Sequence, residues 1–261
     1  MSRQLNEIQR AASEQFGRQS HRYGKGHILE NVADVRAAVE KIPLPARARV
    51  LDVAAGAGHT GLYFAGLGHE VTLSDLTEAM LQRIREAATA RGLEVELCQH
   101  PAEAMPYPGG NFDLVTCRVA PHHFSSPEDF VNEVARVLRR GGHFLLIDGS
   151  MDDDELESEV WLHEVEKLRD PSHHRFLTPR AWAKLCAAAG LGVRVNEMNP
   201  RKQPDLEWYF ETAATPSENR ARVRELISTA PESVRRALKL EEEDGKIIWW
   251  WPMLTLVVQK E

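Results

Sequence analysis

The chain has 261 residues, of which 43% are hydrophobic and 27% charged, as is usual for a globular protein. This length suits one large α/β domain or a domain with a small cap. The formal net charge is −7 and no stripe of Lys and Arg is present, so we expect no nucleic-acid surface. The longest apolar run, residues 247–258, contains a proline and is too short to span a bilayer, so no membrane span is expected.

The cysteines and the N-terminus predict a cytoplasmic protein. Three cysteines, an odd number, lie in apolar segments, which indicates buried free thiols suited to a reducing compartment. The first residues contain no apolar stretch of the kind that forms a signal peptide. The sequence does not predict an oligomeric state.

The first 41 residues carry apolar side chains at helix spacing, and two prolines end this pattern. Short apolar strands then alternate with helices, which predicts a doubly wound, mostly parallel sheet with right-handed crossovers. The predicted strands are Arg49–Val53, Glu70–Ser74, Leu93–Gln99, Leu114–Arg118 and His143–Asp148. The helices between them are expected near residues 59–67, 77–91 and 127–139, with Gly92 and Gly141 as helix C-caps.

After residue 148 the alternation changes. Residues 152–169 are predicted to form a charged amphipathic helix, and a second helix is expected to begin with Thr178 as N-cap and to end at Gly190. Residues 191–195 and 253–258 are predicted strands. The polar segment between them, residues 200–245, is expected to be mostly helical, with its acidic run at 241–244 in a helix start or turn.

A glycine-rich turn follows the first predicted strand. Residues 49–61, Arg-Val-Leu-Asp-Val-Ala-Ala-Gly-Ala-Gly-His-Thr-Gly, run from an apolar strand into a helix. Gly56 and Gly58 allow a tight turn and a close approach of the backbone to a ligand, and the helix N-terminus points free N–H groups into the same space. Asp75, at the end of the second strand, is placed to accept hydrogen bonds from both hydroxyls of a ribose. This layout predicts a site for an adenosine-containing cofactor.

The glycine spacing alone also fits the dinucleotide pattern G-x-G-x-x-G, which leaves a nicotinamide-dependent oxidoreductase as an alternative. Such an enzyme would need a catalytic Tyr/Lys or His pair after the fifth strand, and none is found. Asp52, inside the first strand, would repel a pyrophosphate but not the cationic amino-acid end of S-adenosylmethionine (SAM). Residues 51–58 resemble the first motif of class I SAM-dependent methyltransferases, with Ala54 where that family usually has its first glycine.

The resemblance covers most of the chain. Residues 101–115 are similar to the family segment that leads into the fourth strand. Residues 116–124 and 134–148 resemble a strand end and a helix, Gly-Gly turn and strand of bacterial relatives of the ubiquinone/menaquinone C-methyltransferases, the methyltransferase type 11 group. Residues 16–23 and 169–173 have counterparts there as well. The chain is identified as a member of that group, in a branch whose substrates are mostly unassigned.

This resemblance implies a Rossmann-like sheet of seven strands whose last strand is antiparallel and lies beside the fifth. It also implies an N-terminal helical lid over residues 1–44, a SAM-binding core over 45–150, and a C-terminal part over 151–261 that carries substrate-cap helices. These parts are expected to form one structural domain, with residues 200–245 inserted before the last strand as the cap.

In an open parallel sheet, ligands bind outside the carboxyl ends of the strands. Pro101 offers adenine neither an N–H nor a polar side chain, so its recognition is expected to use the backbone of Ala102 and the apolar side chain of Leu76. The resemblance implies that two residues of the N-terminal lid, Tyr23 and His27, cover the amino-acid end of SAM. The full predicted cofactor set is Asp52, Ala54, Gly56, Gly58, Asp75, Leu76, Ala102, Arg118, Tyr23 and His27.

His122 and His123 follow the end of the fourth strand, beside the reactive methyl group in relatives. Either histidine could take a proton from a substrate hydroxyl, amine or acidic carbon; alternatively, one caps the next helix or packs in the loop. No carboxylate or cysteine accompanies them at ligand spacing, so no metal is expected.

The predicted activity is direct transfer of a methyl group from SAM to a small organic acceptor. The apolar C-terminal segment suggests an acceptor of aromatic or lipid-like character. The alternatives are a SAM-binding protein without catalysis and the NAD(P)-dependent oxidoreductase.

Overall fold

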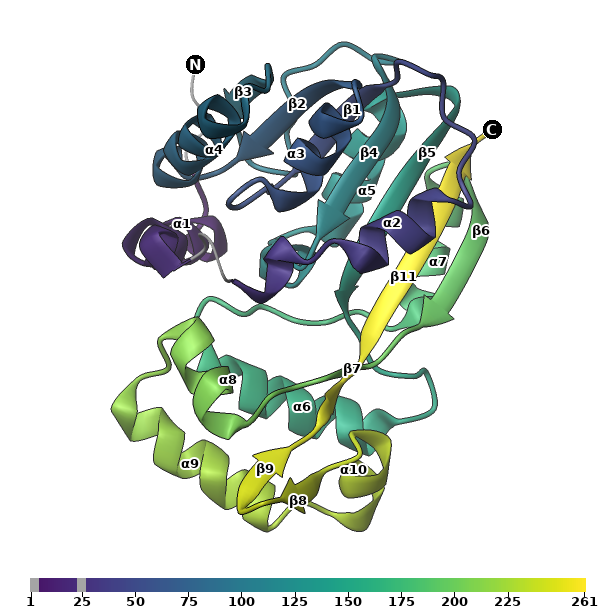
Figure 1. Ribbon diagram of the computed structural model, residues 1–261. Helices are drawn as coiled ribbons and strands as arrows, with labels where there is room; N and C mark the ends of the chain where they lie inside the picture. The colour runs from purple at the N-terminus through teal and green to yellow at the C-terminus, as the bar shows by residue number, and fades with distance from the viewer. Residues whose placement is uncertain (1–4, 23–26) are drawn as a thin grey trace.

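The computed structural model describes residues 5–22 and 27–261, and its centre is a sheet of seven strands (Figure 1). The strand order is β3-β2-β1-β4-β5-β11-β6. Neighbours from β3 to β5 pair in parallel, whereas β11 pairs antiparallel with both β5 and β6. The predicted Rossmann-like sheet with an antiparallel last strand is therefore confirmed. Its strands are β1 Arg49–Val53, β2 Glu70–Asp75, β3 Glu96–Gln99, β4 Phe112–Arg118, β5 Leu138–Gly149, β6 Leu191–Met198 and β11 Met253–Lys260.

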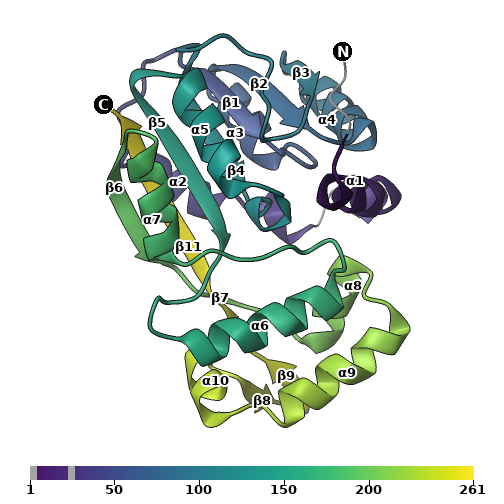
Figure 2. The same cartoon turned by 180° about the vertical axis from the view of Figure 1, so that it is seen from behind.

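Both faces of the sheet are covered because its strands are apolar on both sides. In β1, Val50 belongs to one hydrophobic cluster with Phe64, while the next residue, Leu51, belongs to a second cluster with Phe130. Figure 2, seen from behind, shows α5 and α7 on the second face. The helices around the sheet are α2 Ala33–Val39, α3 His59–Gly66, α4 Glu78–Arg91, α5 Pro127–Val137 and α7 Pro179–Ala188.

Two of the predicted helix caps, Gly92 and Thr178, are confirmed, and the one predicted at Gly141 is wrong. Gly92 has a left-handed backbone and caps α4, and the Thr178 hydroxyl accepts from the Ala181 N–H at the start of α7. Gly141, however, is not a helix cap, because α5 ends at Val137 and Leu138 already belongs to β5. Its φ of 73° serves a bulge where the β4–β5 register shifts. A left-handed glycine suits either role, so the sequence alone did not separate them.

A second layer of helices, here called the cap, lies beyond the carboxyl ends of the strands (Figure 1). Residues 200–245 are mostly helical, as predicted, but the cap also recruits α6 from before β6. The acidic run at 241–244 forms one strand and the turn of a hairpin, not a helix start. The cap consists of α6 Leu156–Arg169, α8 Leu206–Ala213, α9 Ser217–Ser228, α10 Glu232–Ala237 and the hairpin β8 Glu241–Glu243 and β9 Lys246–Ile248.

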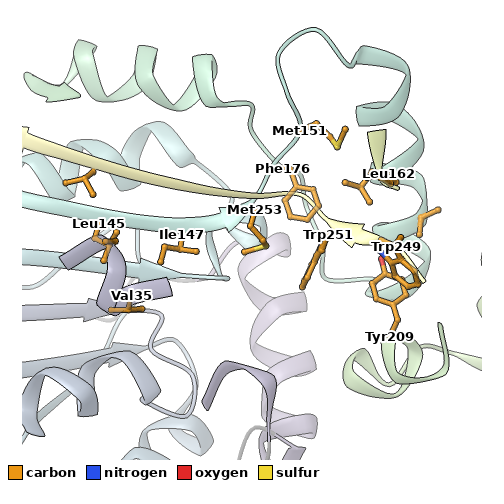
Figure 3. Packing of buried hydrophobic residues seen from close by; sticks show 14 of the residues in the cluster. Val35, Leu145, Ile147, Met151, Leu162, Phe176, Tyr209, Trp249, Trp251 and Met253 are labelled. Atoms are coloured by element: carbon orange, nitrogen blue, oxygen red, sulfur yellow. The ribbon is translucent and has the colours of Figure 1, made fainter. Parts of the chain in front are cut away.

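The cap and the sheet share one hydrophobic cluster. Figure 3 shows Ile147 and Met253 of the sheet leading through Trp251 to Trp249 and Tyr209 in the cap. A short antiparallel ribbon carries the chain between the two parts: β7 (Arg201–Lys202) leads into the cap and β10 (Trp250–Trp251) leads out. The cap is thereby packed against the edge of the sheet at which ligands bind in this fold class.

The N-terminal helix α1 (Glu7–Gln19) bridges the two layers. The side-chain amides of Gln15 and Gln19 both donate to the carbonyl oxygen of Ala213 in α8, at 3.3 and 3.0 Å. On the sheet side, the amide of Gln9 donates to the carboxylate of Glu103 at 3.0 Å. Helix α1 therefore closes one side of the space between sheet and cap.

Candidate functional site

One cavity lies where the strand ends, the N-terminal segment and the cap meet. The N-terminal wall comes from α1 and residues 27–29, the sheet wall from the ends of β1, β2 and β4 and from residues 100–103, and the cap wall from α8 and β10. Tyr23 lies outside the described residues, and neither Asp52 nor Gly58 reaches the cavity wall. The predicted residues that do line it are His27, Ala54, Gly56, Asp75, Leu76, Ala102, Arg118, His122 and His123.

The two glycines of the turn have different roles: Gly58 allows close packing, and Gly56 exposes backbone to the cavity. Gly56 and Gly58 have φ values of 57° and 81°, a region that favours glycine. A Cβ built on Gly58 would come within 3.0 Å of Ile84 and 3.2 Å of Leu73, so Gly58 lets the turn pack on its neighbours. A Cβ on Gly56 would meet no other protein atom within 4 Å, so this backbone borders open space. The turn thus exposes its backbone to the cavity at Gly56.

Ala54 departs from glycine in its geometry as well as in its sequence. Its φ is 52°, in the left-handed region that costs a residue with a Cβ about 1–2 kcal/mol. The turn is therefore built on a backbone shape for which a glycine is the relaxed choice.

Asp52 lies beneath the turn and is fully buried. Its Oδ1 accepts from the Thr116 hydroxyl at 2.7 Å and its Oδ2 accepts from the Gly61 N–H at 2.9 Å. Burial raises the pKa of this carboxyl to about 6, against the lowering effect of those hydrogen bonds. Asp52 therefore joins β1 to β4 and to the start of α3.

Asp75 ties the end of β2 to the glycine turn. Its Oδ2 accepts from the Gly56 N–H at 2.9 Å, and its Oδ1 accepts from the Thr77 N–H at 2.9 Å and the Thr77 hydroxyl at 2.6 Å. Burial raises its pKa, although these bonds favour the charged form. The carboxylate borders the cavity beside Leu76.

Arg118, the last residue of β4, lies in the cavity wall with its donors turned to the N-terminal segment. Its Nη1 donates to the Leu29 carbonyl at 2.8 Å and its Nη2 to the Asn31 carbonyl at 2.7 Å. Its Nε donates to the carboxylate of Asp34 at 3.0 Å. The side chain thereby holds residues 29–34 against the sheet.

His122 is paired with a carboxylate that the sequence reasoning did not single out. Its Nδ1 lies 2.6 Å from Oδ1 of Asp148, and both side chains are buried. Burial alone would lower the pKa of His122, but the Asp148 charge and hydrogen bond outweigh it, and the pKa is raised. Asp148 lies near the end of the fifth strand, next to the end of the fourth, and this neighbouring position is the sequence signal for the pair.

His123 differs from His122 in its hydrogen-bond partners and in the direction of its pKa shift. Its Nδ1 lies 3.1 Å from the Ser172 carbonyl and 3.2 Å from the Ser172 hydroxyl, which in turn donates to Asp170 at 2.6 Å. Burial, followed by the charge of His122, lowers the pKa of His123 to about 3. Neither histidine caps the next helix, because the Ser126 side chain does so. The pKa of one imidazole is therefore raised and that of its neighbour is lowered.

The cap contributes aromatic groups to the cavity. Trp208 and Trp251 lie in its wall, and Phe16 of α1 lies there too, with its ring edge-on to His123 at 4.8 Å between centroids. Among the three consecutive tryptophans, Trp251 lines the cavity, whereas Trp249 packs in the core against Tyr209.

A buried polar network supports the cap wall, and one of its members, Arg169, also lines the cavity. Glu166 accepts from the Tyr209 hydroxyl at 2.5 Å and from Arg169 at 3.1 Å. The Arg169 guanidinium lies over the rings of Tyr209 and Trp251, at 4.3 and 5.4 Å from their centroids. These contacts fix the indole of Trp251 at the edge of the cavity.

Within residues 5–22 and 27–261, no set of three or more His, Cys, Asp or Glu side chains is arranged to hold a metal ion. No helix in that part of the chain is long and apolar enough to cross a membrane.

Comparison with known proteins agrees with this geometry. Residues 51–146 match the family model of a methyltransferase domain. The uncharacterized methyltransferase YcgJ of Bacillus subtilis is 32% identical over 222 residues, which cover 84% of this chain and 87% of that protein. The crystal structure of YcgJ is similar with a TM-score of 0.83, at 28% identity, over 88% of this chain and 99% of that one.

Two more distant relatives extend the comparison. The ubiquinone/menaquinone biosynthesis C-methyltransferase UbiE of Azotobacter vinelandii is 33% identical over 118 residues, 43% of this chain and 47% of that protein. The structure of geranyl diphosphate C-methyltransferase from Streptomyces coelicolor, bound to S-adenosyl-L-homocysteine, has a TM-score of 0.70 at 12% identity and shares the fold. YcgJ is matched over most of its own length and of this chain, and the methyltransferase domain model includes the glycine turn. The chain therefore belongs to the class I SAM-dependent methyltransferases.

Proposed function

We propose that His122 takes a proton from the acceptor during methyl transfer and that Asp148 enables it to do so. The observation that carries this proposal is the 2.6 Å contact between Nδ1 of His122 and Oδ1 of Asp148, in the cavity wall. With Nδ1 donating to the carboxylate, Nε2 is the nitrogen that bears the lone pair. Asp148 then stabilises the imidazolium that proton transfer creates.

The glycine turn is proposed to hold SAM, and its geometry fits that ligand. Gly56 presents backbone to open space, and Asp75 borders the same space with a carboxylate suited to ribose hydroxyls. When bound, SAM supplies a sulfonium methyl group that is already reactive toward nucleophiles. Ala54, Leu76, Ala102 and His27 are proposed to contact the cofactor, and Asp52, Gly58 and Arg118 to shape its site.

The acceptor is proposed to be a small molecule with an acidic hydroxyl, amine or carbon on an aromatic or lipid-like body. Phe16, Trp208 and Trp251 support this, because large rings favour flat apolar groups. Aligning the acceptor with the methyl group can lower the barrier by about 7–11 kcal/mol. A positioned base adds about 10²- to 10⁴-fold, so His122 is the smaller of the two effects. His123 is proposed to contact the acceptor as a neutral ring.

The first test is a thermal-shift comparison of SAM, S-adenosylhomocysteine, NAD and NADP. At about 100 times the dissociation constant, a ligand stabilises the folded state by about 2.7 kcal/mol. We expect shifts with the first two compounds, and a shift with a nicotinamide would contradict the cofactor assignment. A panel of phenols, hydroquinones and unsaturated fatty acids is then screened for transfer of a radiolabelled methyl group from SAM.

With any acceptor found, His122→Gln and His123→Gln separate the proposed roles. We expect His122→Gln to lower turnover by about 10²- to 10⁴-fold at unchanged affinity for S-adenosylhomocysteine. We expect His123→Gln to raise KM for the acceptor more than it lowers turnover. Wild-type turnover in His122→Gln would overturn the assignment of His122 as the base.

We also propose that the protein works in the cytoplasm. The support is that Cys98, Cys117 and Cys186 are all free thiols, as suits a reducing compartment. Cell fractionation with an antibody to the chain tests this, and recovery only from an oxidising compartment would contradict it.

A further inference from the structure

The carboxylate of Asp34 joins three parts of the molecule. Asp34 lies in the first turn of α2, in the N-terminal segment. Its Oδ2 accepts from Nε of Arg118 at 3.0 Å, from Nη2 of Arg118 at 2.9 Å and from Nη2 of Arg201 at 2.8 Å. Arg118 ends β4 of the sheet, and Arg201 belongs to the β7–β10 ribbon that leads to the cap. One carboxylate therefore connects the N-terminal segment, the sheet and the cap ribbon.

Both arginine partners of Asp34 are connected to the cavity wall. Arg118 itself lies in the wall, and it holds the carbonyl of Leu29, another wall residue. Arg201 is paired with Trp251 across the ribbon, and Trp251 forms part of the cap wall. The distance between the Leu29 wall and the Trp251 wall is consequently set through Asp34.

The three side chains that meet at Asp34 are exposed to solvent to different degrees. The side chain of Arg118 is 4% exposed and that of Asp34 18%, whereas that of Arg201 is 28% exposed. Pairs with little solvent contact are weakly screened, so they hold their geometry better than surface pairs. The neighbouring residue Lys202 pairs with Glu243 inside the cap, at exposures of 43% and 44%. Arg201 can therefore be changed without uncovering Arg118, and Lys202 is its matched control.

We propose that Asp34 is a positioning residue for methyl transfer. Its bond to Arg201 fixes the cap ribbon against the N-terminal segment and keeps the walls formed by Leu29 and Trp251 closed around the bound cofactor and acceptor. This role rests on the cofactor site in the cavity, and it is independent of which histidine takes the proton.

The test compares Arg201→Met with Lys202→Met and uses S-adenosylhomocysteine as the probe. Its dissociation is followed by stopped-flow tryptophan fluorescence. We expect Arg201→Met to raise the dissociation rate constant about 5- to 150-fold, the range of typical coupling between sites, with a much smaller change in association. Its emission without ligand should also shift to the red, because Trp251 gains contact with water. Lys202→Met should keep both wild-type values.

Two further variants locate the effect at Asp34. Asp34→Asn should speed dissociation at least as much as Arg201→Met, and Asp34→Glu should restore part of the wild-type rate. If Asp34→Asn does not fold, judged by circular dichroism, Arg201→Met and Asp34→Glu still decide the matter. A folded Arg201→Met with wild-type dissociation and emission would overturn the proposal, as would an equal effect of Lys202→Met. Failure of the wild type to bind the probe would refute the cofactor site itself, whereas intact binding with an unchanged Arg201→Met refutes only the role of Asp34.

Discussion

The imidazole of His122 and the carboxylate of Asp148 meet at 2.6 Å beside the ends of two neighbouring parallel strands, β4 and β5. His122 lies in a 3-10 turn, Pro121–His123, that follows β4, and Asp148 is the second-last residue of β5. The Val119 N–H donates to the Ile147 carbonyl at 2.7 Å, so the pairing of the two strands continues just beyond the end of β4 and brings the turn close to Asp148. This geometry gives the first prediction.

Asp148→Asn should lower the pKa of His122, because it removes the charge that raises this pKa above its usual value near 6.5. The imidazole would then lose its proton at lower pH. Turnover with a suitable acceptor should fall by about 10²- to 10⁴-fold, and its acidic limb should move to lower pH. Histidine NMR titration measures the pKa without any acceptor, and His122→Gln identifies the signal. An unchanged His122 pKa in Asp148→Asn would contradict the pairing.

Asp52 should make the protein less stable as the pH rises from about 4 to about 6. Its folded-state pKa of about 6 lies above the ordinary 3.8, so the folded protein holds this proton more tightly than the unfolded chain. The stabilisation is complete below 3.8 and lost as the pH passes the folded pKa. Two pKa units correspond to about 3 kcal/mol.

Urea unfolding of wild type and Asp52→Asn at several pH values tests this dependence of stability on pH. The free energy of unfolding of the wild type should fall relative to that of the variant across this range. Asp152→Asn, at an exposed position, serves as the control and should run parallel to the wild type. A constant difference between wild type and Asp52→Asn would show that the Asp52 proton does not depend on folding.

Ala54→Gly should stabilise the chain by about 0.5–1 kcal/mol. The left-handed backbone costs alanine about 1–2 kcal/mol, and the greater freedom of glycine in the unfolded chain returns part of that gain. The matched change Gly56→Ala, at a φ of 57°, should be destabilising and should also weaken SAM binding, because its Cβ enters the cavity. Thermal unfolding and calorimetric titration with SAM measure both effects. A destabilised Ala54→Gly would mean that the Ala54 methyl group packs more favourably than its backbone strain costs.

Tyr209→Phe should destabilise the cap by about 1.5–3 kcal/mol, because the buried Glu166 carboxylate loses the hydroxyl that donates to it. In a chain of this size, each kcal/mol lowers the melting temperature by about 2–4 °C. Differential scanning calorimetry provides the measurement. Tyr63→Phe, at a partly buried position in α3, is the comparison variant. A loss of less than 0.5 kcal/mol would imply that Glu166 is satisfied by Arg169 alone.

The sheet and the conformation of the glycine turn were predictable from sequence because their signals are local. Alternating strands and helices, a strand–glycine–helix run and a carboxylate at a strand end each occupy a few consecutive residues. Gly141 shows the limit of such signals, since the same left-handed glycine serves a helix cap and a strand bulge.

The partners of the site residues were harder to predict because they lie far apart in sequence. Asp148 follows His122 by 26 positions, and Arg201 follows Asp34 by 167. Nothing in the sequence near Asp34 indicates that its carboxylate pairs with two arginines. The recruitment of α6 into the cap likewise depends on tertiary packing.

The β7–β10 ribbon has an evolutionary consequence. Between residues 200 and 252 the chain leaves the sheet and returns to it through two short paired segments, while β6 and β11 stay adjacent. Most of the cap is therefore an insertion between β6 and β11 whose two ends lie side by side in the ribbon. Its helices can be lengthened, shortened or exchanged without altering the strand order around the glycine turn. A lineage with this architecture can change the sequence and length of the insertion, and with it the acceptor, while the methyl donor's site stays as it is.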